Sequence, residues 1–224
     1  MGSLFTHDGR VRPVIRYVGS KYRKIQELLD IFDLDENSTF IDLFAGSGIV
    51  SVNVKNLVGC KVVTNDYDHI FPLSWDFVSK NQRTYEGLGK IETTMAIANF
   101  ERRCRLGLSG KVTEYNQILE SCEILHKDYR DVEITPGSVV YVDPPYYGIK
   151  GLYQHTIDHK ELREYLQKYV GGGHIIVSYN DCLFIRELYK DWHIKTLEFK
   201  YSSGGYGSAV KTKKELLISN WKWK

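Results

Sequence analysis

Short apolar runs alternate with amphipathic segments along this 224-residue chain. The apolar runs are typical of buried strands, and they cover residues 39–44, 61–66, 123–125, 139–142 and 174–178. Apolar residues at helical spacing predict helices over residues 21–32, 49–57, 70–78, 159–169 and 181–189. Strands that alternate with helices predict an α/β fold with a parallel sheet, starting from the β-α-β unit of residues 39–66.

Turn residues predict where several of these elements begin and end. Gly19-Ser20 is expected to cap the first helix, and Gly59 is expected to end the second. Residues 194–201 and 215–220 have the pattern of strands, and they flank the loop SSGGYGSAVKTKK. Two terminal strands joined in this way predict an antiparallel hairpin at a sheet edge.

The segment of residues 81–120 is polar, punctuated by glycines and only weakly periodic. It interrupts the strand and helix pattern, so we expect a small inserted region between two parts of one core, residues 1–80 and 121–224. The predicted fold is a doubly wound, mostly parallel sheet with an antiparallel C-terminal hairpin. A chain of this length can bury a sizeable core.

Positive charge is concentrated locally, although the formal net charge is only +2. From Lys190 to Lys224 there are eight lysines against three acidic residues. A second cluster comprises Arg102, Arg103 and Arg105. Such patches fit contact with phosphates, and they equally fit a solvated surface.

The remaining composition narrows the class of protein. The apolar and charged fractions are those of a soluble globular protein, with neither a membrane-spanning run nor a signal peptide, so we expect a cytoplasmic protein. The cysteines, residues 60, 104, 122 and 182, form no C-x-x-C pair and are expected to be reduced thiols. His155 and His159 have no acidic or cysteine partner at ligand spacing, so we expect no metal.

A glycine-rich turn, Phe44-Ala45-Gly46-Ser47-Gly48, follows the first predicted strand and precedes a helix. Glycines allow backbone N–H groups to approach a ligand closely at a helix N-terminus. Asp66 ends the next strand, where nucleoside-binding folds place the acid that accepts from ribose hydroxyls. The third glycine of a dinucleotide motif is absent, because that position is Ser51, which disfavours an NAD-dependent oxidoreductase.

A second candidate site is Asp143-Pro144-Pro145-Tyr146, directly after the apolar run VVYV. Two prolines stop the strand and hold an extended turn at its carboxyl end, where ligands bind in open α/β sheets. A carboxylate, backbone carbonyls and an aromatic ring suit a flat substrate that carries an NH2 group, such as adenine.

In this order the motifs resemble the D12 class of Dam-type DNA adenine methyltransferases, which carry DPPY. IRYVGSKYR, FIDLFAGSGIVSVN, VVTNDYD, KDYRD, VVYVDPPY, IIVSYND and KYSSGGYGSAVKTKKELLISN each resemble a family motif. The resemblance covers most of the chain. It implies a class I methyltransferase fold, S-adenosylmethionine as cofactor, and a target-recognition role for the inserted region.

The resemblance also implies roles for individual residues. Asp143, Pro144, Pro145 and Tyr146 would be catalytic. The cofactor-binding residues would be Tyr17, Lys21, Asp42, Phe44, Gly46, Gly48, Asp66, Asp128 and Asp143. We expect the DNA contacts from Arg102, Arg103, Arg105, Lys211, Lys213 and Lys214.

The chain departs from the family pattern at a few positions. Tyr17 replaces the usual tryptophan, and Ser20 replaces a glycine. In the strand motif Ser178-Tyr179-Asn180-Asp181 the asparagine is displaced, so no role is transferred to it. The segment before DPPY is short for a target-recognition domain.

The implied function is site-specific methylation of the N6 amine of a flipped-out adenine in double-stranded DNA, by a monomer or weak dimer of bacterial or phage origin. The recognition sequence GATC is a family-level expectation, and a cognate restriction endonuclease is an open possibility. Two other functions stay open: an amino-methyltransferase acting on RNA or another nucleobase amine, and a non-catalytic DNA-binding relative.

Overall fold

The computed structural model describes residues 3–15, 17, 19–68, 72–83, 94–149, 155–202 and 210–223. For residues 94, 95, 199–202 and 210–213 it describes the backbone only. The chain divides into two compact units, Met1–Glu133 and Ile134–Lys224, and each is described by itself.

The first unit contains three parallel strands in the order β3-β2-β1. Their bounds are Thr39–Asp42 for β1, Lys61–Asn65 for β2 and Glu123–Leu125 for β3. Helix α2, Ile49–Val58, connects β1 to β2 and ends at Gly59, whose φ of 79° provides a left-handed cap. The predicted β-α-β unit and its terminating glycine are therefore confirmed.

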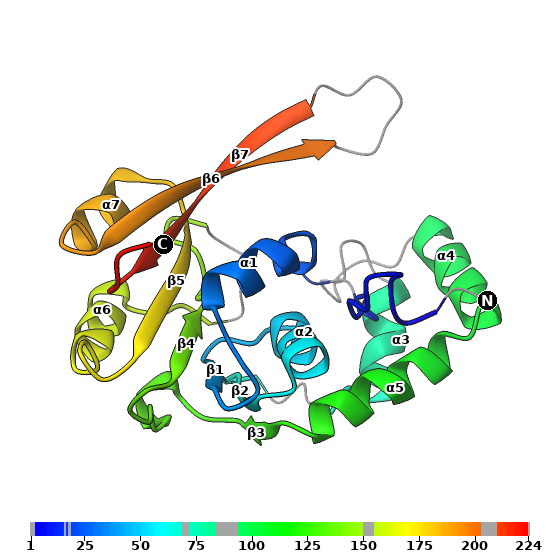
Figure 1. The fold of residues 1–224 in the computed structure, drawn as a ribbon. Helices are drawn as coiled ribbons and strands as arrows, with labels where there is room; N and C mark the ends of the chain where they lie inside the picture. The colour runs from blue at the N-terminus through cyan, green and yellow to red at the C-terminus, as the bar shows by residue number, and fades with distance from the viewer. Residues whose placement is uncertain are drawn as a thin grey trace. The chain divides into compact units, whose positions relative to one another are not determined.

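The other described helices of the first unit are α1, Ile25–Phe32; α3, Trp75–Arg83; α4, Thr94–Arg105; and α5, Leu108–Glu120 (Figure 1), together with two short 3-10 turns, η1, Tyr22–Lys24, and η3, Tyr129–Asp131. The predicted cap at Gly19-Ser20 is wrong. A short 3-10 turn comes first, its N-cap is Lys21, and no side chain caps it. Lys21 is buried and its Nζ donates to the Gly19 carbonyl oxygen. Gly19 is therefore bonded to the Lys21 side chain and does not cap the helix. Of the helix expected over residues 70–78, residues 70 and 71 lie outside the described residues, residues 72–74 are not helical, and α3 begins only at Trp75.

Helix α5 lies within residues 81–120, where the sequence is only weakly periodic. Its buried residues, Leu108, Val112, Tyr115 and Leu119, recur at helical spacing. Polar residues between them masked this stripe in the sequence. The predicted inserted region thus contributes a buried helix face to the first unit, and its role in target recognition stays a prediction.

The second unit contains β4, Val139–Val142; β5, His174–Asn180; β6, His193–Ser202; and β7, Val210–Ser219. β4 and β5 are parallel, whereas β7 pairs antiparallel with both β5 and β6. β6 lies at the edge, which confirms the predicted C-terminal edge hairpin. The hairpin extends beyond β5, because β5 pairs only with the five residues from Glu215 to Ser219 (Figure 1). The predicted loop is too long, because residues 210–214 belong to β7; the connection that remains, residues 203–209, lies outside the described residues.

Two helices complete the described part of the second unit: α6, His159–Gln167, and α7, Leu183–Leu188. Asp158 caps α6 by accepting from the backbone N–H groups of Lys160 and Glu161. The strands β4, β5 and β7 carry the buried core, including Tyr141, Val177 and Ile218. The seven described strands are mostly parallel with an antiparallel C-terminal pair, as predicted. Among the described residues, no helix is both long and apolar enough to cross a bilayer.

Candidate active site

The carboxyl ends of β1, β2 and β3 are held together by Asn65. Its Nδ2 donates to the carbonyl oxygens of Leu43 and Lys127, both at 3.1 Å, and its Oδ1 accepts from the Lys127 N–H at 3.0 Å. Asn65 is 1% exposed, so these bonds form away from water. The backbone continues the contact, since Ala45 N–H donates to the Asn65 carbonyl oxygen at 2.9 Å. The loops that follow the three strands are therefore fixed relative to one another.

Asp66 follows Asn65 and holds the glycine turn. Its Oδ2 accepts from Gly46 N–H at 2.7 Å, and its Oδ1 accepts from Asp68 N–H at 3.0 Å. Burial raises the pKa of Asp66 to about 6, although these two backbone hydrogen bonds act in the opposite direction. Each carboxylate oxygen can still accept from a further donor, such as a ligand hydroxyl.

Tyr17 lies against the same turn. A Cβ added to Gly46 would lie 2.6 Å from Tyr17 Cε1, so the aromatic ring occupies the space that a side chain would need. Gly46 and Gly48 have φ of 54° and 71°, a region that residues with a Cβ rarely adopt. The Tyr17 side chain remains 37% exposed and offers an aromatic surface beside the turn. The structure thus brings Tyr17, Gly46 and Asp66 together.

Asp42 lies beneath this turn and is 1% exposed. Its Oδ2 accepts from Ser51 Oγ at 2.7 Å, and Ser51 Oγ is also 3.0 Å from Thr64 Oγ1. Ser51 occupies the position where a dinucleotide motif has its third glycine. The hydroxyl there satisfies a buried carboxylate, a task that glycine could not perform.

Two further predicted cofactor residues lie near the ends of β1 and β3. The Phe44 ring is 5.5 Å from the Tyr129 ring, between centroids. Asp128, adjacent to Tyr129, forms an ion pair with Arg130 at 2.7 Å, and hydrogen bonds from Arg130 lower the pKa of Asp128. An aromatic pair and a carboxylate therefore adjoin the strand ends.

Helix α5 supports the turn from the other side. The fully buried Tyr115 donates through Oη to the Ser47 carbonyl oxygen at 2.9 Å. Burial raises the pKa of Tyr115, so this hydroxyl keeps its proton. A residue 68 positions away in the sequence thus fixes the turn's backbone.

In the second unit, Asp143-Pro144-Pro145-Tyr146 directly follows β4. Pro144 is buried, whereas Asp143, Pro145 and Tyr146 are half-buried. Neighbouring β5 supports the segment: Tyr146 Oη lies 3.4 Å from Ser178 Oγ, and the Tyr146 ring is 6.2 Å from that of Tyr179. The segment is therefore placed at the carboxyl end of a strand, as predicted.

Asn180, to which the sequence alone assigned no role, contacts the residue after this segment. Its Nδ2 donates to the Tyr147 carbonyl oxygen at 3.2 Å. The Tyr147 ring stacks on Phe184 with centroids 4.1 Å apart. His159 Nδ1 lies 2.7 Å from Tyr179 Oη, and burial lowers the pKa of His159. These contacts from β5, α6 and α7 fix the backbone that follows Tyr146.

The family model described as D12 class N6 adenine-specific DNA methyltransferase matches residues 17–103 and 108–203. The chain belongs to this family. The matched residues include the glycine turn, Asp66 and the DPPY segment, so both strand-end sites lie within the family's own region.

Solved structures with a similar fold include two precorrin-6Y C5,15-methyltransferases. The C-terminal domain of the Rhodobacter capsulatus enzyme is 13% identical, with a TM-score of 0.52 over 93% of this chain and 95% of that one. The Geobacter metallireducens enzyme is 12% identical, with a TM-score of 0.50 over 95% and 98%. At such identities the likeness shows the fold alone, which is the class I methyltransferase fold used with S-adenosylmethionine.

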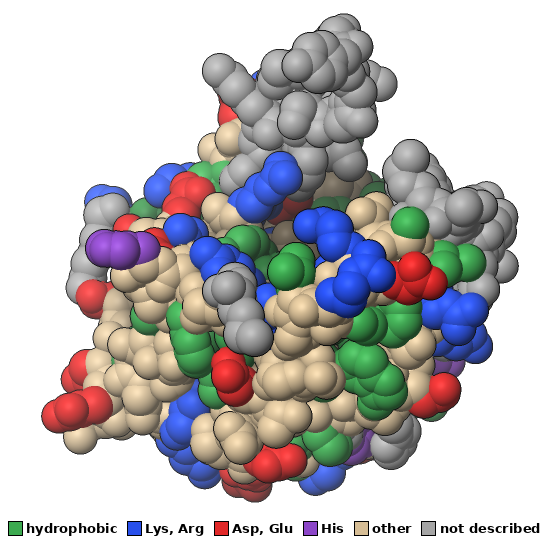
Figure 2. Space-filling view, turned by 90° about the vertical axis from the view of Figure 1, so that its right-hand side faces the viewer, with side chains coloured by type: hydrophobic (Ala, Val, Ile, Leu, Met, Phe, Trp, Pro, Cys, Tyr) green, Lys and Arg blue, Asp and Glu red, His purple; other side chains and the backbone are tan. Residues whose placement is uncertain are grey.

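The basic residues predicted to contact DNA in this D12 family member differ in their surroundings. Arg102 and Arg105 on α4 are exposed, whereas Arg103 is half-buried and donates to Gln82 Oε1 at 2.8 Å. Lys214 on β7 lies 3.4 Å from Glu198. The side chains of Lys211 and Lys213 lie outside the described part of the chain. Figure 2 faces the side on which α4 lies in Figure 1, and it shows basic side chains gathered there.

Three residues that hold the site were not identified from the sequence: Asn65, Tyr115 and Asn180. Asn65 has a local signal, because an asparagine that ends an apolar strand beside Asp66 is an unusual choice for a buried position. Tyr115 and Asn180 have no such signal, since their partners are distant in sequence. Within the described residues, no group of three or more His, Cys, Asp or Glu could hold a metal ion.

Proposed function

We propose that this protein transfers a methyl group from S-adenosylmethionine to the N6 amine of an adenine flipped out of duplex DNA. The observation that carries the proposal is the DPPY segment at the carboxyl end of β4, in a chain that belongs to the D12 family. This segment offers the acceptors and the aromatic ring that an adenine amine needs.

The turn of the first unit fits the cofactor. The Tyr17 ring packs directly on Gly46 and offers an aromatic surface beside the turn, and Asp66 can accept from ribose hydroxyls while it holds the turn. Phe44 and Asp128 would border the adenine ring, whereas Lys21 would approach the methionine part. Asp42 and Gly48 would act through the shape of the turn, because Asp42 is buried beneath it and Gly48 is its left-handed residue.

When bound, S-adenosylmethionine supplies an electrophilic methyl group on a sulfonium, and the methyl leaves with its bonding electrons remaining on sulfur. The adenine amine is a weak nucleophile, since its lone pair is delocalised into the ring. The Asp143 carboxylate and the Pro144 carbonyl oxygen would accept hydrogen bonds from the two amine hydrogens, and one of these protons would be released to solvent after the methyl group has moved to nitrogen. These acceptors favour a pyramidal nitrogen and stabilise the positive charge that develops on it.

Positioning would supply much of the remaining effect. The two prolines limit the backbone freedom of the acceptors, Ser178 contacts the Tyr146 hydroxyl, and Asn180 holds the carbonyl oxygen of the next residue, Tyr147. Tyr146 would stack on the base. Accurate alignment of two reacting atoms can contribute several kcal/mol, on the order of 7 or more in favourable cases.

The target adenine has to leave the duplex, at a cost of about a few kcal/mol. Contacts to the DNA backbone have to offset this cost, and the basic residues of α4 and of the C-terminal hairpin are the candidates. We expect these contacts from Arg102, Arg105, Lys211, Lys213 and Lys214, with Arg103 in a mainly structural role because it is bonded to Gln82.

Transfer of a tritiated methyl group to unmethylated duplex DNA tests the proposal. We expect N6-methyladenine after nucleoside digestion, and a rate at least about 100-fold lower for Asp143→Asn. Glu164→Gln on the exposed face of α6 is the matched control and should retain the wild-type rate. Binding of S-adenosylmethionine, measured by calorimetry, separates loss of chemistry from loss of cofactor.

Two results would contradict the proposal. Absence of label in DNA with saturating cofactor would support a non-catalytic DNA-binding relative. Label in RNA but not in DNA would support the RNA alternative, which is open because Asp143 and Pro144 would contact the amine and not the sugar. Sequencing the methylated positions in DNA from cells that express the chain would give the recognition sequence.

A further inference from the structure

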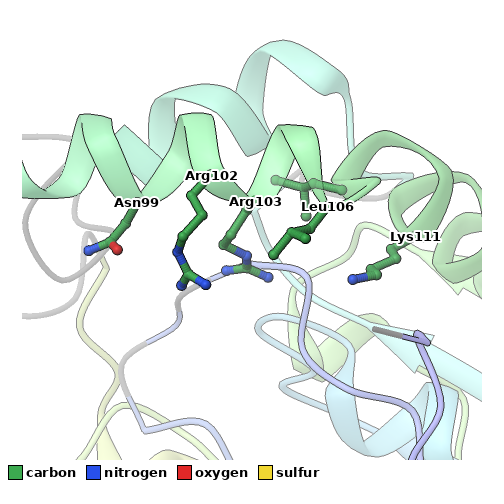
Figure 3. Close-up of a pocket in the computed structure, with 6 residues that line it drawn as sticks. Asn99, Arg102, Arg103, Leu106 and Lys111 are labelled. Atoms are coloured by element: carbon green, nitrogen blue, oxygen red, sulfur yellow. The ribbon is translucent and has the colours of Figure 1, made fainter. Parts of the chain in front are cut away.

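A cavity of about 460 Å³ lies between α4 and α5 in the first unit. It is lined by Asn99, Arg102, Arg103, Leu106, Leu108 and Lys111. Figure 3 shows Asn99, Arg102 and Arg103 pointing to the same side of α4, with Lys111 of α5 pointing toward them. We call this the α4–α5 pocket. Three cationic side chains from two helices therefore converge on one space.

The three cations of the α4–α5 pocket are not equivalent. Arg103 donates to Gln82 Oε1 at 2.8 Å, and the fully buried Gln82 in turn donates to the Val14 carbonyl oxygen at 2.8 Å. This chain of hydrogen bonds fixes Arg103 to the N-terminal segment. Arg102 and Lys111 have neither an ion pair nor a side-chain hydrogen bond among the described residues.

The charged residues that line the pocket favour a negatively charged ligand. Among the described lining residues none is acidic, so no described carboxylate in the pocket balances Arg102 and Lys111. The first turn of α5 is also free of acidic residues. An anion placed between the two cations would gain charge-assisted hydrogen bonds, and the Asn99 amide could donate a further one.

The flanking leucines argue for a polymer rather than a free inorganic ion. Leu106 and Leu108 add an apolar wall, and the volume exceeds what one phosphate needs, so there is room for the sugars on either side of a phosphodiester. A methyltransferase that flips a base also needs firm backbone contacts beyond its catalytic residues.

We propose that the α4–α5 pocket binds one phosphodiester of the DNA backbone between Arg102 and Lys111, with Asn99 as a third donor. The proposal rests on the proposed function, because DNA is the polyanion it names. It adds Lys111 and Asn99 to the contacts expected from the sequence. It assigns Arg103 to the support of the pocket and leaves Arg105 outside it. The contact anchors DNA and reads no base.

The test is the salt dependence of DNA affinity for the double variant Arg102→Gln/Lys111→Gln. Because each phosphate contact adds about −0.9 to the slope of log K against log salt, loss of one contact makes this slope less steep by about 0.9. We expect this change together with weaker binding that is uniform across duplexes of different sequence. The control Lys61→Gln/Lys168→Gln removes the same charge from two exposed positions outside the pocket and should keep the wild-type slope. Unchanged thermal unfolding shows that the variants are folded.

Each other outcome contradicts the proposal in a distinguishable way. If the pocket variant keeps the salt slope of the wild type while the wild type methylates DNA, the proposed phosphate contact is wrong and the proposed function stands. A loss of affinity confined to the recognised sequence indicates a base contact instead. Tight calorimetric binding of inorganic phosphate that depends on Arg102 and Lys111, with DNA affinity unaffected by the variant, indicates a site for the free anion. Failure of the wild type to bind DNA overturns both proposals, whereas DNA binding without methylation overturns the proposed function alone.

Discussion

The strand-end turn of the first unit and the α4–α5 pocket are both polar, but they are built in opposite ways. At the turn, Asn65, Asp66 and Tyr115 are all engaged in hydrogen bonds with backbone groups, and most of them are buried. In the pocket, Arg102 and Lys111 extend from two helices without an ion pair among the described residues. The turn fits a small ligand of constant shape, whereas the pocket fits a charged polymer that can adapt.

The difference has a physical basis. A small cofactor gains affinity when its site is already formed, because little ordering remains to be done on binding. A polyanion gains affinity from charge and from the release of counterions, which require exposed cations rather than a fixed geometry. Stability should therefore depend on the turn and hardly at all on the pocket's two unpaired cations.

The largest effect is expected from Asn65→Leu, which keeps the side-chain size and removes its hydrogen bonds. The carbonyl oxygens of Leu43 and Lys127 and the Lys127 N–H would lose their partner, at about 1–3 kcal/mol each. We expect the free energy of unfolding in urea to fall by about 3 kcal/mol or more. Asn56→Leu, which removes one exposed hydrogen bond to Gly9, should cost less than about 1 kcal/mol. Equal costs would mean that the strand ends are not held by Asn65.

Gly46→Ala should cost about 2 kcal/mol, since it combines a left-handed backbone with a contact to Tyr17 at 2.6 Å. In a Tyr17→Ala background the cost should be smaller, because the contact is gone and only the backbone strain remains. Gly110→Ala on α5 is the control, as its Cβ would meet nothing within 4 Å, and it should be neutral or stabilising. Urea unfolding of the four variants of the cycle measures the coupling, and a coupling of zero would show that Tyr17 does not lie on the turn.

The affinity for S-adenosylmethionine should weaken about tenfold from pH 7 to pH 5, because the pKa of Asp66 is about 6 and a protonated carboxyl accepts less well from ribose hydroxyls. Asp66→Asn should bind more weakly at pH 7 and lose this pH dependence, as calorimetry at several pH values would show. The fold responds in the opposite direction. Since the folded state holds this proton more tightly than the unfolded state, Asp66 lowers the free energy of unfolding as the pH rises from about 4 to 6. A pH-independent affinity in the wild type would contradict the role of Asp66.

The smallest expected effect is a difference in stability between variants of two neighbouring arginines of α4. Arg103→Ala should cost about 1 kcal/mol through the lost hydrogen bond to Gln82, whereas Arg102→Ala should change stability by less than about 0.5 kcal/mol. Thermal unfolding of the two variants under the same conditions provides the measurement. A larger loss of stability for Arg102→Ala than for Arg103→Ala would show that the Arg102 side chain stabilises the fold and does not serve only to bind a ligand.

Much of the fold could be predicted from local pattern. The order of strands and helices, the turn from Phe44 to Gly48, and the edge hairpin all follow from periodicity and turn chemistry. The predictions from sequence were wrong where a tertiary contact outweighs a local sequence preference. Gly19-Ser20 does not cap the first helix because the adjacent Lys21 is buried and bonded to Gly19, and the α5 stripe was obscured by polar residues between its buried positions.

By itself, the sequence determined that DPPY follows a buried strand, that Asp66 stands at the carboxyl end of another, directly after its last residue, and that the motifs of one methyltransferase family occur in order. These are properties of neighbouring residues, so a linear pattern carries them. Only the tertiary structure decided that Asn65 joins three strand ends, that Tyr115 supports Ser47 from 68 residues away, and that Arg102 and Arg103 have different tasks. Those properties depend on which distant segments pack together, and no local periodicity records that choice.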